Sequence, residues 1–543
     1  MVDRGRLTAS CPSILSSSKS SYRVMGSSSE RKGGAILFFI SFFSLELCTA
    51  IDTIASSQSI RDPETLISVG GNFRLGFFSP GNFKNRYVGI WYNIDSEPTP
   101  TIIWVANREN PLIDSSGVLT IADDGNIVVL DGRNNILWST NVSNIARNSS
   151  AMLLDSGNLV LREENSTARF LWQSFDHPTD SFLPEMKIGV NLRTGEKKQL
   201  TSWKSDSDPS TGTFSAGISL LNIPQVFIWK GSIPQWRSGP WNNRTFIGIP
   251  DDYSVYLNGF NIIRDNPEGS LYVTYNESFA KFVLNSQGIL VQTNWDVETK
   301  EWVTAWLSPR TVCDAYGKCG PFGSCEAGNS QICSCLRGFE PKSIEEWSKG
   351  NWRNGCVRRT QLQCERNNGS RKVGEQDGFF KLEMMKVPDS ANWLSAEDVV
   401  ECEKQCLRNC SCVAFAYDSG IGCMSWSGNL IDTQKFSKAG VDLHIRVAYS
   451  ELGRKKKEKK KLKFDRLEAY KETSNDSMAE ENKNHREGLE IPFFNFENMV
   501  IATDNFDGAN KLGQGGFGPV YKNSASTVEA EMCLRISMRH DMK

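Results

Sequence analysis

The sequence predicts a mainly β, multidomain protein stabilised by disulfide bonds. Short runs that alternate apolar and polar residues recur between turn residues from about residue 53 onward, which is typical of β-strands. Aromatic residues are plentiful, with 15 Trp and 29 Phe, and many of the 15 Cys lie close together. A chain of 543 residues is also too long for one hydrophobic core, so we expect several domains.

The charge balance bears on whether the chain binds nucleic acid. Lys and Arg total 61 and Asp and Glu total 63, which gives a formal net charge of −2. A chain with so little net charge has no global field that attracts nucleic acid. We therefore expect no nucleic-acid partner.

The cysteines indicate an oxidising compartment. Twelve of the 15 lie between Cys313 and Cys423. An even, clustered set predicts a disulfide framework. Zinc is the alternative, because two C-x-C pairs occur, but the chain has only 4 His. We expect disulfides and no metal site.

The N-terminal region predicts entry into the secretory pathway. Arg31 and Lys32 precede the apolar run Ala35–Leu45, and small residues follow it, as in a signal peptide. Residues 1–50 then form an upstream extension plus the signal peptide. Met25 is the expected start, and Met1 stays open as the alternative. No later apolar stretch reaches 18 residues, so the sequence predicts no transmembrane helix and a lumenal C-terminus.

Seven N-x-S/T sequons between residues 141 and 411 agree with export, because this tripeptide accepts N-linked glycans on secreted proteins. The expected glycosylation sites are Asn141, Asn148, Asn165, Asn243, Asn276, Asn368 and Asn409.

Strand-like runs fill residues 53 to 170. Gly, Asn and Asp interrupt the Val, Ile, Leu and Trp at about every tenth residue, which predicts an all-β barrel or prism. The segments DDGNIVVL and DSGNLVL look like an internal repeat. Together with WVANRENPL, these runs resemble the bulb-type mannose-binding lectins. The resemblance implies a β-prism of three four-stranded sheets over residues 51–171.

The resemblance also implies a sugar site. Lectins of this family hold sugar with the pattern Q-x-D-x-N-x-V-x-Y, in which polar groups pair with hydroxyls and an apolar side chain packs on the ring. This chain keeps Asp124, Asn126 and Val128 but has Ala122 and Leu130 in place of the Gln and Tyr. The alternative is that the Asp and Asn residues of both repeats only build turns, namely Asp124, Asn126, Asp155 and Asn158.

Residues 172–310 carry a second set of motifs. WQSFDHPTDSFLPEMKIG and WRSGPWNNRTFIGIP resemble the S-locus glycoprotein region of plant receptor-like kinases. We expect a second β-rich domain here. His177, Asp176 and Asp180 could indicate a catalytic or metal cluster, but we interpret them as a polar turn between strands.

Residues 311–358 resemble an EGF-like module. Sequence alone allows fifteen pairings of six cysteines, so the pairing rests on the resemblance. The EGF order implies Cys313–Cys325, Cys319–Cys333 and Cys335–Cys356.

Residues 364–448 resemble a PAN/apple module, an α+β unit with a helix expected near residues 396–407. Disulfides help a small module whose core alone is marginal. The resemblance implies Cys402–Cys423 and Cys406–Cys412, and leaves Cys364 and Cys410 as candidates for a third pair.

Composition changes at residue 449. Residues 449–488 form a basic and polar linker that includes Arg454–Lys463. It is either a solvated linker or a basic juxtamembrane stretch. The apolar helix that precedes such a stretch in the family is missing from the sequence.

Residues 489–522 resemble the start of a serine/threonine kinase domain with its glycine-rich loop, and residues 523–543 form an unrelated tail. In a kinase the loop glycines let the backbone approach nucleotide phosphates. The sequence lacks the catalytic Lys, H-R-D and D-F-G segments, so we expect a relic that does not fold alone and binds neither ATP nor Mg, the cofactors of the intact family. The loop residues are Leu512, Gly513, Gly515, Gly516, Gly518 and Val520.

Taken together, residues 25–522 resemble the G-type lectin S-receptor-like serine/threonine kinases. The family role is cell-surface recognition and signalling, such as pollen recognition or defence. We expect this chain to be a truncated, catalytically inactive ectodomain that is extracellular or at the cell surface. Its expected partners are a peptide, protein or glycan ligand and, through homo- or hetero-dimers, full-length receptor kinases. The alternatives are a mannose-binding lectin and a full receptor kinase in a longer isoform.

Overall fold

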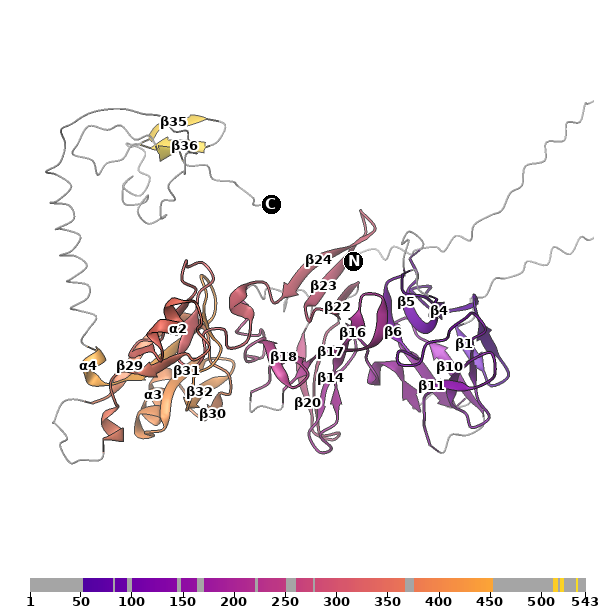
Figure 1. The fold of residues 1–543 in the computed structure, drawn as a ribbon, viewed down its shortest axis with the longest axis horizontal. Helices are drawn as coiled ribbons and strands as arrows, with labels where there is room; N and C mark the ends of the chain where they lie inside the picture. The colour runs from indigo at the N-terminus through magenta and orange to yellow at the C-terminus, as the bar shows by residue number, and fades with distance from the viewer. Residues whose placement is uncertain are drawn as a thin grey trace, which may run out of the picture. The chain divides into compact units, whose positions relative to one another are not determined.

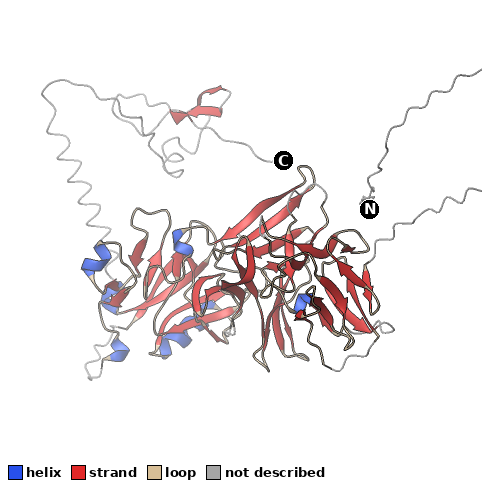
Figure 2. Ribbon diagram, turned by 45° about the vertical axis from the view of Figure 1, so that its right-hand side comes forward, coloured by secondary structure: helices blue, strands red, loops and turns tan. Residues whose placement is uncertain are grey.

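The computed structural model describes residues 52–81, 84–94, 100–143, 148–163, 170–219, 223–250, 260–276, 279–366, 376–452, 511–515, 518–521 and 534–535. The chain divides into two compact units, residues 1–459 and 460–543. Strands make up most of the regular structure (Figure 2), so the prediction of a mainly β, multidomain fold is confirmed. The expected signal peptide and the linker from residue 453 onward lie outside the described residues.

Residues 53–173 form a first prism of three four-stranded antiparallel sheets (Figure 1). The sheets have the strand orders β3-β4-β5-β6, β2-β7-β8-β9 and β1-β10-β11-β12. The β-prism implied by the lectin resemblance is therefore confirmed. Its strands are β1 (Thr53–Ala55), β2 (Ser59–Arg61), β3 (Thr65–Ile67), β4 (Phe73–Phe78), β5 (Tyr87–Tyr92), β6 (Ile102–Val105), β7 (Val118–Ile121), β8 (Ile127–Leu130), β9 (Ile136–Ser139), β10 (Ser149–Leu153), β11 (Leu159–Glu163) and β12 (Trp172–Gln173).

Three tryptophans contact one another inside the first prism. Trp104 of β6, Trp138 of β9 and Trp172 of β12 each come from the last strand of one sheet. Their ring centroids lie 5.7, 5.9 and 5.7 Å apart, and each pair meets edge to face. This geometry is favourable for aromatic rings, so the triad joins the three sheets at their common interior.

Residues 181–308 form a second prism on the same plan. Its sheets have the strand orders β13-β22-β23-β24, β15-β14-β21-β20 and β16-β17-β18-β19, again antiparallel. The sequence predicted only a β-rich domain here. Its strands are β13 (Ser181–Phe182), β14 (Ile188–Asn191), β15 (Lys197–Lys198), β16 (Leu200–Ser205), β17 (Asp208–Ile218), β18 (Val226–Lys230), β19 (Ile233–Arg237), β20 (Asn261–Asp265), β21 (Ser270–Thr274), β22 (Ala280–Leu284), β23 (Leu290–Asp296) and β24 (Glu301–Ser308).

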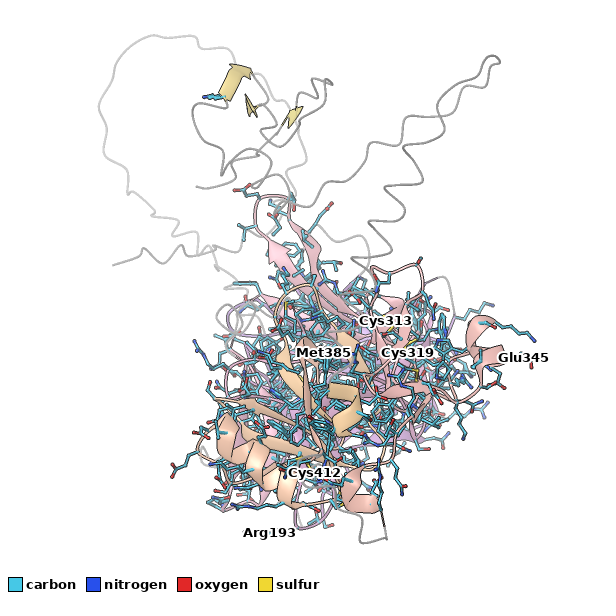
Figure 3. The ribbon with its side chains drawn as sticks, turned by 90° about the vertical axis from the view of Figure 1, so that its left-hand side faces the viewer. Arg193, Cys313, Cys319, Glu345, Met385 and Cys412 are labelled. Atoms are coloured by element: carbon cyan, nitrogen blue, oxygen red, sulfur yellow. A yellow bond between two sulfur atoms is a disulfide. The ribbon has the colours of Figure 1, made fainter. Side chains whose placement is uncertain are left out.

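The EGF-like and PAN segments share one eight-stranded sheet of order β26-β25-β33-β29-β34-β31-β32-β30. The link is a parallel pairing of β25 with β33, in which Ser324 lies opposite Thr433. Cys313, Cys319 and Cys412 lie inside this region, while Glu345 lies at its surface (Figure 3). The strands are β25 (Gly323–Cys325), β26 (Cys333–Cys335), β27 (Phe339–Pro341), β28 (Cys356–Arg358), β29 (Gly378–Lys386), β30 (Asn392–Leu394), β31 (Cys412–Asp418), β32 (Gly422–Ser427), β33 (Thr433–Lys435) and β34 (Val441–Val447).

The main described helix is α3 (Val399–Arg408). It begins three residues later than the sequence predicted, because the side chain of Asp398 accepts a hydrogen bond from the Glu401 N–H over 2.8 Å and caps the helix. The remaining helical elements are η1 (Ser174–Asp176), η2 (Val312–Asp314), α2 (Ile344–Ser348), η3 (Gln363–Glu365) and α4 (Tyr449–Leu452).

The second unit contains three short strands, β35 (Lys511–Gly515), β36 (Gly518–Tyr521) and β37 (Leu534–Arg535), paired antiparallel. We expected a kinase relic that does not fold alone. β35 and β36 pair as a hairpin, which needs only residues close together in sequence.

Candidate functional site

The residues of the sugar pattern lie at the turn between β7 and β8. Gly125 has a φ of +84°, and its N–H donates to the Ala122 carbonyl over 2.8 Å. Asp124 is exposed, and its Oδ1 accepts a hydrogen bond from the Asn126 N–H over 3.0 Å. This hydrogen bond lowers the pKa of the Asp124 carboxyl. The carboxylate therefore stabilises the turn.

Asn126 points into the protein and is 5% exposed. Its Oδ1 accepts hydrogen bonds from Thr140 Oγ1 and the Val142 N–H, both over 2.8 Å, and its Nδ2 donates to the Val142 carbonyl over 3.2 Å. Val128 on β8 is 1% exposed. The structure thus brings Asp124, Asn126 and Val128 into one hairpin, but only Asp124 faces solvent.

The second repeat has the same construction. Gly157 has a φ of +84° and lies in the turn between β10 and β11. Asn158 is 5% exposed, its Oδ1 accepts a hydrogen bond from Ser174 Oγ over 3.1 Å, and its Nδ2 donates to Gln173 Oε1 over 3.0 Å. Asp155 Oδ1 accepts a hydrogen bond from a glycine N–H of the β3–β4 turn over 2.6 Å. These contacts agree with the alternative that the Asp and Asn residues build turns.

The WVANRENPL motif joins the two prisms. Arg108 Nε donates to the Pro209 carbonyl over 2.7 Å, and its Nη1 donates to Thr201 Oγ1 over 2.7 Å. Glu109 Oε1 accepts a hydrogen bond from the Thr211 N–H over 2.9 Å. We call these contacts the Arg108 clamp. Sequence reasoning assigned this motif to the lectin fold and missed its role between domains.

The polar residues of WQSFDHPTD lie beside the same joint. His177 stacks on Trp172 with ring centroids 5.3 Å apart, and burial lowers the pKa of its imidazole. Asp176 forms an ion pair with Lys198 over 2.6 Å. Asp180 is 7% exposed, and burial raises the pKa of its carboxyl to about 6. The three side chains have separate partners and belong to the packing of the joint.

A buried charged cluster, here called the Arg237 hub, joins the second prism to the PAN segment. Arg237 Nε lies 2.7 Å from Asp432 Oδ2, and Lys386 Nζ lies 3.0 Å from the same oxygen. All three side chains are at most 3% exposed. The N–H of Gly317, in the EGF-like segment, donates to Asp432 Oδ1 over 2.9 Å. The WRSGPW motif thus supplies a cation whose partners could not be found by local sequence analysis.

Two opposing effects set the charges in the hub. Burial alone would raise the pKa of Asp432, but Lys386 and Arg237 together lower it. Burial lowers the pKa of Lys386, and the nearby Arg237 cation lowers it further, although the Asp432 carboxylate opposes the fall. Asp432 is therefore held as a carboxylate between two cations.

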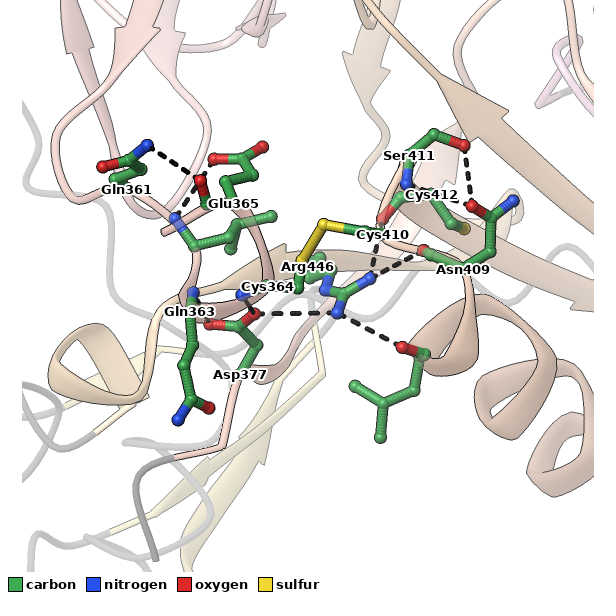
Figure 4. The surroundings of a disulfide bond; sticks show 12 residues. Gln361, Gln363, Cys364, Glu365, Asp377, Asn409, Cys410, Ser411, Cys412 and Arg446 are labelled. Atoms are coloured by element: carbon green, nitrogen blue, oxygen red, sulfur yellow. Dashed lines mark hydrogen bonds and ion pairs between the residues drawn. A yellow bond between two sulfur atoms is a disulfide. The ribbon is translucent and has the colours of Figure 1, made fainter. Parts of the chain in front are cut away.

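Six disulfides cross-link the EGF-like and PAN segments. Five have the pairings that the resemblances imply: Cys313–Cys325, Cys319–Cys333, Cys335–Cys356, Cys402–Cys423 and Cys406–Cys412. The sixth is Cys364–Cys410 (Figure 4). The sulfur atoms of Cys319, Cys325 and Cys333 approach one another, but each is in a disulfide and offers no thiolate to a metal.

Comparison with known proteins gives the same order of segments. Models of a D-mannose binding lectin, an S-locus glycoprotein domain and a PAN-like domain match residues 101–204, 236–343 and 364–433. The G-type lectin S-receptor-like serine/threonine-protein kinase SD1-13 of Arabidopsis thaliana is 43% identical over 533 residues, which cover 90% of this chain and 63% of SD1-13. The chain belongs to the G-type lectin S-receptor-like family.

Other family members agree. B120 of Arabidopsis thaliana is 39% identical over 548 residues, which cover 89% of this chain and 63% of B120. The chain thus spans less than two thirds of the length of these relatives.

Solved lectin structures show only a local likeness. The mannose-specific agglutinin from snowdrop (Galanthus nivalis) bulbs is 20% identical, with a TM-score of 0.17, and covers 22% of this chain and 94% of its own. The two-domain Scilla campanulata agglutinin is 12% identical, with a TM-score of 0.17, and covers 48% of this chain and 87% of its own.

The glycine-rich loop of this family member is only partly described. Leu512, Gly513 and Gly515 lie on β35 and Gly518 and Val520 on β36, while Gly516 lies outside the described residues. Gly515 lies opposite Gly518 in the hairpin.

Five of the seven sequons between residues 141 and 411 have an asparagine in the described residues, and all five asparagines are exposed: Asn141, Asn148, Asn243, Asn276 and Asn409. Asn165 and Asn368 lie outside the described residues. Among the helices of the described part of the chain, none has the length and hydrophobicity needed to cross a bilayer.

Proposed function

We propose that this chain is the extracellular ligand-recognition part of a receptor-like serine/threonine kinase. The observation that carries the proposal is the order of lectin, S-locus and PAN segments in one compact unit, shared with relatives over 90% of the chain. The relatives' names describe receptor-like kinases. We assign to this chain the ligand recognition of such a receptor and not its kinase activity.

The secretory route supports this assignment. Six disulfides cross-link the described chain, nine of their twelve cysteines are buried, and disulfides of this density persist in oxidising compartments. The exposed sequons are placed where glycans could be attached without disturbing the core. We propose location at the cell surface or outside the cell, with dimers of this chain and full-length receptor kinases as the signalling assembly.

The ligand is proposed to be an extracellular peptide, protein or glycan bound away from the sugar pattern. Val128 is 1% exposed and Asn126 is held by internal hydrogen bonds, so neither can contact a sugar ring without unfolding the hairpin. Asp124 alone remains accessible, and one carboxylate is too little for specific sugar binding.

Two measurements test the proposal with the full chain expressed in plant cells. We expect a glycan on Asn148, detected by a glycosidase-sensitive mass that Asn148→Gln removes, and chain at the cell surface or in the medium. Unmodified chain in the cytosol would contradict the proposed location. On immobilised mannose we expect no specific retention, and retention that Asp124→Asn abolishes would support a mannose-binding lectin instead.

A further inference from the structure

The turn after α3 combines a glycosylation sequon with a disulfide. Asn409, Cys410 and Ser411 form the sequon, and Cys410 is bonded to Cys364, 46 residues earlier in the chain (Figure 4). Asn409 is exposed and is the C-cap residue of α3. The same tripeptide is therefore both a glycosylation sequon and part of a cross-linked turn.

In the folded turn the acceptor side chain is held by its own sequon. Asn409 Oδ1 accepts hydrogen bonds from the Ser411 N–H over 3.1 Å and from Ser411 Oγ over 2.8 Å. The Asn409 carbonyl accepts hydrogen bonds from the Cys412 N–H over 3.0 Å and from Arg446 Nη1 over 2.8 Å. The disulfide Cys406–Cys412 closes the same turn. The turn is thus fixed on both sides of Asn409.

Glycan transfer needs a different conformation. In this reaction the asparagine Nδ2 bonds to the anomeric carbon of a lipid-linked oligosaccharide, the bond from that carbon to the pyrophosphate oxygen breaks, and Nδ2 loses a proton. The tripeptide must lie in the transferase cleft with its amide oriented on the sugar carbon. In the folded turn the Ser411 hydroxyl is already donated to Asn409, and the Cys410 disulfide prevents the tripeptide from extending. The folded turn is therefore a poor acceptor.

Arg446 bridges the two segments that the disulfide joins and is synthesised after the sequon. Its guanidinium lies 3.6 Å from Asp377, and Asp377 Oδ2 accepts a hydrogen bond from the Cys364 N–H over 3.4 Å. Arg446 thereby connects Asp377, which accepts from the Cys364 N–H, to the Asn409 carbonyl next to Cys410, and it lies 37 residues beyond Asn409. At about 5–20 residues per second, synthesis takes a few seconds to supply it. Disulfide formation also takes seconds or longer. Closure of Cys364–Cys410 therefore does not always precede or always follow the time at which the nascent Asn409 can accept a glycan.

We propose that Asn409 receives its glycan only before Cys364–Cys410 closes, so that glycosylation and disulfide formation compete at this turn. The proposal rests on the secretory route proposed above. In molecules whose disulfide closed first, Asn409 stays unmodified, and in the others it carries a glycan. Secreted chains therefore differ in the occupancy of Asn409.

Peptide mass mapping of the full chain tests this competition. We would express the wild-type chain and Cys364→Ser in a secretory host and digest total cell protein, so that misfolded molecules are counted. We expect partial occupancy of Asn409 in the wild type and at least a two-fold rise in Cys364→Ser. Dithiothreitol during synthesis should raise occupancy without any substitution.

Two controls make the result specific. Occupancy of Asn148, which lies in the lectin segment, should not change, and Cys335→Ser, which opens a disulfide of the EGF-like segment, should leave Asn409 unchanged. Full occupancy of Asn409 in the wild type, or equal occupancy in wild type and Cys364→Ser, would overturn the competition while leaving the secretory route intact. An unmodified Asn148 in every sample would overturn the route itself and the competition with it.

Discussion

At the scale of single residues, Asp180 links the stability of the prism joint to pH. Its Oδ1 accepts long hydrogen bonds from the Thr179 and Ser181 hydroxyls, both over 3.3 Å. Burial raises the pKa of the carboxyl from 3.8 to about 6, although Arg108 and these hydroxyls oppose the rise. The folded protein therefore holds this proton more tightly than the unfolded chain does.

The stability that Asp180 contributes should accordingly fall as pH rises. The contribution is fully present below the unfolded pKa of 3.8 and is lost as pH passes through about 6. At about 1.4 kcal/mol per pKa unit, the loss is about 3 kcal/mol. Asp180→Asn should remove this dependence, so the difference in unfolding free energy between variant and wild type should change across this range. Urea unfolding at several pH values measures it, and parallel pH profiles would contradict the assignment.

At the scale of elements, the two repeated hairpins show what local sequence can and cannot reveal. The glycines at 125 and 157 follow from the need for a positive φ in each turn. Local patterning did not reveal that Asn126 and Asn158 point inward, because both side chains bond to residues beyond the hairpin itself. A sugar site at these residues would need the asparagine side chains to point to solvent.

Substitution in the β7–β8 hairpin separates the inward from the outward residue. Asn126→Ala should cost about 2–3 kcal/mol of unfolding free energy, because the hydroxyl and N–H that it pairs with are left unsatisfied in a buried site. Asp124→Ala is the matched control at the exposed side of the same turn and should cost less than about 1 kcal/mol. Chemical unfolding of the two variants checks the order. Equal costs would show that Asn126 is not the residue that stabilises the hairpin.

At the scale of the whole first unit, the Arg237 hub connects segments far apart in sequence. Arg237 and Asp432 are 195 residues apart, and Lys386 completes a cluster of two cations on one carboxylate. Removing one partner of a buried ion pair leaves an uncompensated charge, which is costly. The loss of unfolding free energy should therefore depend on which of the three charged side chains is removed.

Asp432→Asn should be the most damaging change in the hub, at about 3–5 kcal/mol, because it leaves two buried cations without a counter-charge. Lys386→Met is the matched control. It leaves the Arg237–Asp432 pair, 2.7 Å apart, intact and should cost less. Limited proteolysis between the second prism and the PAN segment, together with thermal unfolding, measures the effect. A larger loss of stability in Lys386→Met than in Asp432→Asn would refute this account of the hub.

The sequence by itself determined the features that depend on neighbouring residues. Strand and turn spacing predicted an all-β barrel or prism in the first domain, and the cysteine clusters marked the cross-linked segments. The lectin and PAN resemblances, carried by short local motifs, implied the three-sheet prism and a helix within three residues of α3. These features follow from backbone geometry and periodicity, which act over a few residues.

Only the tertiary structure decided the features that depend on distant contacts. The second prism, the sheet shared by the EGF-like and PAN segments, the Arg108 clamp and the Arg237 hub all join residues that lie far apart in the chain. Burial of Val128 belongs here too, because a strand residue becomes inaccessible only when other elements cover it. Burial and ion pairing are properties of the packed molecule, so local pattern could name the candidate residues but not which of them face solvent.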